Sequence, residues 1–148
     1  MTDVEIIWKY FENKKFNKYA IAGIMGNMKA ESGLRSNNLQ NTYERSLGMS
    51  DEEYTKAVDN GSYTNFINDA AGYGLVQFTY SGYKKELYEY CKKQGKSIAD
   101  ITCQLDCLYS QISKSGVATK LNACTSIRQA SDIFLTQYER PANQGESV

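Results

Sequence analysis

Apolar residues recur every three or four positions along most of this chain, which is the spacing of a helix that buries one face. Near the N-terminus, Val4, Ile7, Trp8 and Phe11 predict a helix over residues 3–13. Similar patterns, with the residues that cap or end helices, predict further helices over residues 17–31, 50–60, 62–69, 81–94, 97–115, 117–121 and 126–140. The pattern therefore predicts a mostly α fold.

The remaining stretches lack helical spacing. Residues 34–49 are rich in asparagine and predict irregular chain, and the polar tail 142–148 predicts a frayed end. Residues 70–80 contain too much glycine for a helix, and residues 76–79 favour extended backbone. We therefore expect a helical domain with one short extended or β segment near residues 70–80, and a single domain over residues 1–148.

Glu31 continues an apolar stripe in the second predicted helix. Ile21, Ile24, Met28 and Glu31 are separated by three, four and three residues, so they share one helix face. A carboxyl group in this position is partly desolvated, which raises its pKa, and the negative end of the helix dipole acts in the same direction. A carboxylic acid that stays protonated near neutral pH can serve as a general acid.

The segment Gly72-Tyr73-Gly74-Leu75-Val76-Gln77 is the second candidate for a site. Its glycines let the backbone approach a ligand or another segment closely. Such a segment fits the floor of a polysaccharide groove, with Gln77 and backbone groups bound to sugar hydroxyls. A turn packed under the first helices is the structural alternative. The segment is not a dinucleotide fingerprint, because no strand precedes it and the third glycine is missing.

Composition narrows the chemistry further. The 148 residues contain 17 basic and 17 acidic side chains, so the formal charge is zero, and no basic stripe supports nucleic-acid binding. The chain has no histidine, which excludes Ser-His and Cys-His nucleophile pairs and histidine-bearing zinc sites. No cofactor or metal site is predicted. Carboxylates, tyrosines, lysines, cysteines and backbone groups remain to carry any reaction.

The four cysteines and the absent targeting signals bear on the compartment. Cys103 and Cys107 lie within an apolar helical pattern, so buried free thiols are expected for these two, for Cys91 and for Cys124, with disulfides left open. Free thiols favour synthesis in the cytosol. The N-terminus has no signal-peptide pattern, and no stretch reaches the roughly 18 apolar residues of a membrane span.

One segment carries a specific resemblance. Gly26-Asn27-Met28-Lys29-Ala30-Glu31-Ser32-Gly33-Leu34 resembles the catalytic-glutamate motif of the phage tail lysozyme family, which occurs in bacteriophage endolysins and tail-associated wall hydrolases. The pattern continues in order through Val58-Asp-Asn-Gly61, Phe66, Asp69, Gly72-Tyr-Gly-Leu75, Gln77, Thr79, Lys84-Lys85 and Tyr138-Glu-Arg-Pro141. Family members often carry tryptophan in place of Phe78 and arginine in place of Lys84.

The resemblance implies a lysozyme-like helical fold that cuts the glycan strands of peptidoglycan. It places Glu31 in the general-acid position. It also implies that the side chains nearest the presumed cleft contact the sugar: Tyr73, Gln77, Phe78, Thr79 and Tyr80. The expected activity is that of a muramidase, which cleaves the β-1,4 bond between N-acetylmuramic acid and N-acetylglucosamine.

A second carboxylate decides the mechanism. Glycosidases usually pair two carboxylates, about 5 Å apart for retention and about 6.5–9.5 Å apart for inversion. Asp69 precedes the glycine segment, at a place where goose-type lysozymes carry an aspartate that assists the attacking water. We therefore predict Asp69 as the partner of Glu31. If no carboxylate faces Glu31, lytic transglycosylation, in which the sugar's own 6-hydroxyl attacks, becomes the alternative.

An alternative of a different class is a non-catalytic glycan-binding or structural domain of a phage tail. The expected partners are peptidoglycan glycan strands, together with other modules of a larger phage or wall-hydrolase protein. Neither nucleic acid nor membrane insertion is expected. Such a protein is made in the bacterial cytoplasm and acts at the cell wall, either in host lysis or in the virion tail.

Overall fold

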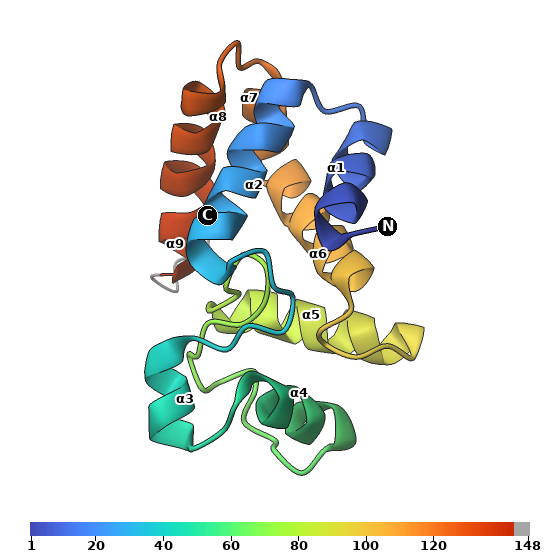
Figure 1. The fold of residues 1–148 in the computed structure, drawn as a ribbon, viewed down its shortest axis with the longest axis vertical. Helices are drawn as coiled ribbons and strands as arrows, with labels where there is room; N and C mark the ends of the chain where they lie inside the picture. Colours follow the sequence, from blue (N-terminus) through green and yellow to red (C-terminus); the bar gives the residue numbers. More distant parts are fainter. Residues whose placement is uncertain (144–148) are drawn as a thin grey trace.

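The computed structural model describes residues 1–143, and these residues form a helical domain with almost no β structure (Figure 1). The helices in chain order are α1 (Asp3–Asn13), α2 (Lys18–Ser32), α3 (Asn41–Leu47), α4 (Asp51–Asn60), α5 (Ser81–Gln94), α6 (Ile101–Lys114), α7 (Val117–Asn122), α8 (Ile127–Phe134), the π-helix η1 (Leu135–Glu139) and α9 (Arg140–Asn143). The predicted mostly α fold is confirmed. The rest of the predicted polar tail lies outside the described residues.

Capping residues explain why most helices begin and end where the sequence predicted. Ser50 and Glu53 form the expected capping box at the start of α4. The Ser126 side chain accepts a hydrogen bond from the Gln129 amide at the start of α8. Gly33 ends α2 with a positive φ of 64°, a conformation that glycine adopts without steric cost. Local hydrogen bonding therefore sets these boundaries.

Four predictions of secondary structure are wrong. Residues 41–47 form α3 rather than irregular chain, while residues 62–69 form turns rather than a helix. The helix predicted from residue 97 begins instead at Ile101 with Asp100 as its cap, and the Ser97 hydroxyl binds the Asp59 carboxylate at 2.5 Å. The helical path also does not end before Pro141: α8, η1 and α9 follow one another without a break, and α9 includes this proline.

The core lies between α1, α2, α6 and α8. Ile7 and Phe11 of α1, Ile24 of α2, Leu105 of α6 and Phe134 of α8 are all completely buried. None of the helices in the described part of the chain is long and apolar enough to cross a membrane. This helical core gives α2 a rigid support on both sides, so its C-terminal end is held in place.

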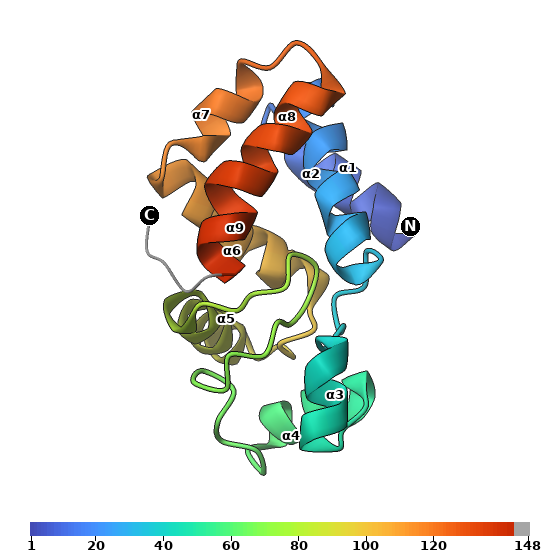
Figure 2. The ribbon, with the colours of Figure 1, turned by 90° about the vertical axis from the view of Figure 1, so that its left-hand side faces the viewer.

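The molecule divides into two ends, with α5 between them. Figures 1 and 2 show α1, α2, α6, α7 and α8 packed at one end and the short helices α3 and α4 at the other. The chain leaving α2 and the segment of residues 70–80 pass side by side between these ends. Isolated antiparallel bridges join Leu39 to Tyr73 and Tyr73 to Phe78, and residues 74–77 between them form a turn, so the extended backbone predicted near residues 70–80 is limited to single residues on either side of a tight turn. The C-terminal end of α2 therefore meets this segment at the waist of the molecule.

Candidate active site

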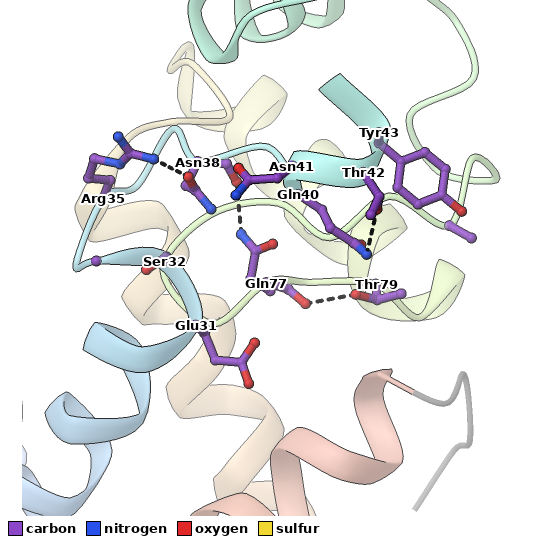
Figure 3. A pocket seen from close by; sticks show the side chains of 12 residues that line it. Glu31, Ser32, Arg35, Asn38, Gln40, Asn41, Thr42, Tyr43, Gln77 and Thr79 are labelled. Carbon is purple, nitrogen blue, oxygen red and sulfur yellow. Dashed lines mark hydrogen bonds between the residues drawn. The ribbon is translucent and has the colours of Figure 1, made fainter. Parts of the chain in front are cut away.

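A polar cavity of about 820 Å³ opens at the waist, between the end of α2, the start of α3 and the segment of residues 70–80 (Figure 3). Its lining side chains are mainly amides and hydroxyls, which suit a ligand rich in hydroxyl groups. The cavity is lined by Glu31, Ser32, Gly33, Arg35, Asn38, Gln40, Asn41, Thr42, Tyr43, Ala70, Gln77 and Thr79.

Glu31 occupies the wall of this cavity as its only carboxylate among the described lining residues. Ile21, Ile24 and Met28, which precede it on the same face of α2, are buried, while Glu31 itself is half-buried. This confirms the apolar stripe expected from the sequence. Burial raises the pKa of the Glu31 carboxyl group above its usual value. The side chain is therefore biased toward the protonated form while still reaching the cavity.

Ser32 fixes the end of α2 to the cavity floor. Its hydroxyl donates to the Met28 carbonyl at 2.9 Å within the helix and is also within hydrogen-bonding distance of the Leu75 carbonyl, at 2.8 Å. The Leu75 amide in turn donates to the Gln104 side chain of α6 at 2.9 Å. These contacts tie Glu31 to a rigid floor, which keeps its carboxyl group in one place relative to a bound ligand.

Gln77 holds the floor segment together. Its side-chain amide donates to the Asn38 carbonyl at 2.8 Å and to the Gly74 carbonyl at 3.0 Å. Its backbone has a positive φ of 55°, a conformation that side chains other than glycine seldom adopt. A side chain at Gly72 would meet the Gln77 amide oxygen at 2.8 Å, so the Gln77 side chain would have to move away from its present position. Gln77 lines the cavity as predicted, although its amide N–H groups serve the fold.

Thr79 also lines the cavity, as predicted, and its hydroxyl donates to the Gln77 carbonyl at 2.9 Å (Figure 3). Tyr80 lies next to it, at the start of α5, where its ring meets the edge of Tyr83 with centroids 5.3 Å apart. Tyr80 is half-buried and does not belong to the cavity lining. The predicted sugar contact is thus supported by position for Thr79 and not for Tyr80.

Tyr73 and Phe78 do not reach the cavity, so their predicted contact with sugar is wrong for this structure. Both rings are buried in the core, with exposed fractions of 0% and 1%. Tyr73 packs against Tyr54 and Phe66 beneath the floor, and its hydroxyl bonds to Thr55. The strand alternation that would expose every second side chain is absent, because the segment is buried on both faces.

Asp69 lies beneath the floor rather than opposite Glu31. Its carboxylate is bound by Lys84 Nζ at 2.5 Å and by the hydroxyls of Tyr54 and Tyr63 at 2.6 and 2.7 Å. Lys84 is fully buried, and this burial lowers its pKa to about 8 against the opposing effect of Asp69. The Asp69 side chain is almost completely buried and does not line the cavity, although Ala70 does. The structure therefore does not bring the two predicted carboxylates together.

The start of α3 forms the opposite wall of the cavity, which the sequence did not predict. Gln40, Asn41, Thr42 and Tyr43 line the cavity, and the Gln40 backbone and side chain pair with Gly72 through bonds of 2.8 and 3.0 Å. The signal was the density of side-chain amides between residues 37 and 41, a composition that fits hydrogen bonding to sugars. The missing helical spacing of residues 34–49 predicts irregular chain and gives no sign of this wall.

Arg35 is the single basic side chain among the described lining residues. Its guanidinium group binds the Asn38 side chain and lies 3.5 Å from the Asp51 carboxylate. Asp51 also accepts a hydrogen bond from the Leu39 amide at 2.8 Å, so it orders the chain that follows α2. Arg35 therefore contributes to the cavity shape, and within the described part of the chain it pairs with Asp51 rather than with Glu31.

The site thus combines one protonatable acid with a wall of neutral hydrogen-bonding groups, which suits acid-assisted cleavage of a polar polymer. No solved structure matches this chain. Its sequence matches the family described as phage tail lysozyme over residues 2–147, nearly the whole length. The chain therefore belongs to the phage tail lysozyme family and is a lysozyme-like, peptidoglycan-acting domain.

Proposed function

We propose that this domain cleaves the glycan strand of peptidoglycan as a muramidase, with Glu31 as the general acid. The observation that carries the proposal is the half-buried Glu31 carboxyl group, whose pKa is raised by burial, in the wall of a polar cavity. A general acid of this kind accelerates bond cleavage by about 10²–10⁴-fold. The membership of the chain in a lysozyme family supports the choice of substrate.

The proposed binding mode uses the neutral polar walls. Sugar hydroxyls and N-acetyl groups both donate and accept hydrogen bonds, and side-chain amides match both properties. Gln40 and Asn41 from the α3 wall and Gln77 and Thr79 from the floor would surround the strand next to Glu31. Tyr43 adds a half-buried aromatic ring, which suits the apolar face of a pyranose.

In the proposed reaction Glu31 gives its proton to the glycosidic oxygen as the bond to the anomeric carbon breaks. The leaving sugar departs with this proton as a free hydroxyl. A hydroxyl group then attacks the anomeric carbon, and the proton that it releases returns the enzyme to its starting state. In hydrolysis the attacking hydroxyl belongs to water.

Lytic transglycosylation is the second candidate, and a specific observation favours it. Glu31 is the only carboxylate among the described residues that line the cavity, and Asp69 faces the core. One carboxyl group can serve both steps when the attacking hydroxyl is the 6-hydroxyl of the same sugar. The predicted help of Asp69 to a water molecule draws no support from its position.

Purified cell walls test the proposal directly. Glu31→Gln should reduce the clearing of wall suspensions by at least about 100-fold, with an unchanged circular dichroism spectrum. Glu12→Gln, at an exposed position of α1, is the matched control and should clear walls at the normal rate. Full clearing by Glu31→Gln would contradict the proposal.

Mass spectrometry of the released fragments separates the chemistries. Reducing ends show hydrolysis, and 1,6-anhydro ends show transglycosylation. Saturable binding of wall glycan without new ends would instead identify a non-catalytic binding domain.

A further inference from the structure

Glu139, the last residue of η1, has a buried carboxyl group whose role is not explained by the fold. Its side chain has an exposed fraction of 0%, and neither carboxyl oxygen has a hydrogen-bond partner among the described residues. Burial raises the pKa of Glu139 well above its usual value, which favours the neutral form of the group. A neutral carboxyl group carries one O–H donor. Buried polar groups are nearly always hydrogen-bonded, so this donor requires an explanation.

The packing of α2 on α8 and η1 brings Glu139 toward Glu31. Gly23, Asn27 and Glu31 are each one turn apart on the same face of α2. A side chain at Gly23 would meet the Ser131 amide at 2.7 Å, and the Asn27 amide donates to the Ser131 carbonyl at 3.1 Å. α8 and η1 run beside α2 in the same direction (Figures 1 and 2). The helical turn of α2 that follows Asn27 therefore brings Glu31 toward η1.

Two further observations support this proximity. The Glu31 carboxyl group points toward the side where the C-terminal helices lie (Figure 3). The charge of Glu31 also acts on Glu139 and raises the pKa of Glu139 further, second to burial. The two carboxyl groups therefore share one electrostatic environment, although they come from opposite ends of the chain.

The π-helix sets the direction of the Glu139 side chain. The Arg140 amide donates to the Leu135 carbonyl, five residues earlier, instead of four as in an α-helix. The extra residue in this turn rotates the side chains that follow relative to an uninterrupted α-helix. Such turns are rare and occur frequently at functional sites.

Among the residues that the structure describes, no cation lies against Glu31 to stabilise its charged form. Burial is the cause of its raised pKa. Lys84 is paired with Asp69, and Arg35 is paired with Asp51. Once Glu31 has given up its proton, its carboxylate needs a hydrogen-bond donor within a half-buried site.

We propose that Glu139 is a positioning residue that supplies this donor: its neutral carboxyl group donates a hydrogen bond, directly or through one water molecule, to the carboxylate that Glu31 becomes. Glu139 keeps its own proton throughout. The proton that leaves Glu31 ends on the hydroxyl of the departing sugar. The catalytic part of this inference rests on the proposed function, while the pairing of the two carboxyl groups does not.

The other titratable groups near η1 raise the pKa of Tyr138, the neighbour of Glu139. They are Tyr83 and Glu86 of α5 and Cys107 of α6. The Tyr138 hydroxyl is already bound to the Gln111 side chain, and its ring stacks on Tyr83. Among the described residues, Glu31 is the charged group whose field reaches Glu139 itself.

The test combines two variants of Glu139 with carbon-13 NMR titration of side-chain carboxyl groups. Glu139→Met removes the donor at similar volume, and Glu139→Gln keeps a donor in the amide. Glu139→Met should raise the pKa of Glu31 and slow wall cleavage by about tenfold, the effect of one lost hydrogen bond to a charged group. Glu139→Gln should restore both properties close to normal. The signal of Glu31 is identified by its loss in Glu31→Gln.

Glu86→Gln is the matched control, since it removes another half-buried carboxyl group and should leave the pKa of Glu31 unchanged. A lower pKa of Glu31 in both Glu139 variants would mean that Glu139 is normally charged, and would overturn the inference. So would an unchanged pKa in Glu139→Met.

If Glu139→Met does not fold, titration of the two carboxyl groups in the unmodified protein still tests the inference. Glu139 must stay protonated over the whole range in which Glu31 titrates, and its ionisation below Glu31 would refute the inference. A protein that cleaves no wall refutes the proposed function and leaves this titration unaffected.

Discussion

Asp69 and Lys84 form a buried ion pair beneath the cavity floor. Two tyrosine hydroxyls and the Ala71 amide complete the hydrogen bonding of the carboxylate. Lys84 also donates to the Ala71 carbonyl at 2.7 Å, so the pair fixes the start of the floor segment. The family resemblance implies a catalytic role for Asp69, whereas the groups that bind its carboxylate indicate a structural role.

The structural role predicts a specific pattern in variants. Asp69→Asn should lower the free energy of unfolding by about 3–5 kcal/mol, because it leaves a buried lysine unpaired. Adding Lys84→Met should recover most of this loss, and the double variant should clear walls at a rate close to normal. Urea unfolding and wall clearing below the melting temperature measure both effects. A stable double variant with about 100-fold lower activity would restore Asp69 as the catalytic base.

The burial of a side chain could be predicted from the sequence for some residues and not for others, for physical reasons. The position of Glu31 followed from helical spacing, since its neighbours on α2 determine how it is buried. Tyr73 and Phe78 could not be placed in this way, because their burial depends on contacts with distant segments such as α4. The position of Glu139 could not be predicted, because nothing in its local sequence shows that its side chain is buried.

The contact between α2 and α8 depends on a single missing side chain. A Cβ atom at Gly23 would lie 2.7 Å from the Ala130 side chain and from the Ser131 amide, and backbone atoms cannot easily yield. Gly26, one turn further, has no heavy atom within 4 Å of the same position. The close packing of α8 therefore explains the glycine at position 23 and does not explain the one at position 26.

Alanine at each glycine tests this difference. Gly23→Ala should destabilise the domain by about 1–3 kcal/mol through overpacking, and should disturb Glu31 as α2 moves away from α8. Gly26→Ala should stabilise it by about 0.5–1 kcal/mol, the gain in helix propensity. Thermal unfolding followed by circular dichroism compares them. Equal effects in the two variants would contradict the close packing at Gly23.

Helices were predictable where a cap or a repeating apolar face marks them: α5 and α7 lack a side-chain cap and still begin at the predicted residues. α4 and α8 begin at side-chain caps and were placed from sequence. α3 has no side-chain cap and is seven residues long, so its stability depends on Gln40 and the floor segment that it contacts. The cavity wall that it forms was missed for the same reason.

For the molecule as a whole, the buried carboxyl groups couple stability to pH. Glu139 holds its proton in the folded state at pH values where the unfolded chain has released it. The contribution of Glu139 to the free energy of unfolding is therefore complete below its ordinary pKa of about 4.5, and it declines as pH rises above that value. Glu31 acts in the same direction, because its pKa is also raised on folding.

Glu139→Gln should remove this part of the pH dependence. The difference in unfolding free energy between the variant and the unmodified protein should grow in favour of the variant from pH 4.5 to pH 7, by at most about 1.4 kcal/mol per pH unit. Urea unfolding across this range, with Glu12→Gln as control, measures the difference. Parallel curves would show that Glu139 is charged in the folded protein.

The pairing of α2 with α8 has a consequence for the order of assembly. Asn27 and Ser131 are joined by hydrogen bonds across more than a hundred intervening residues. The surroundings of Glu31 are thus built from an early and a late part of the chain. During synthesis α2 leaves the ribosome long before α8, and contacts of such long range form late in folding. The acid therefore gains its buried environment only when the late helices dock, and a partly made chain carries an ordinary surface glutamate in its place.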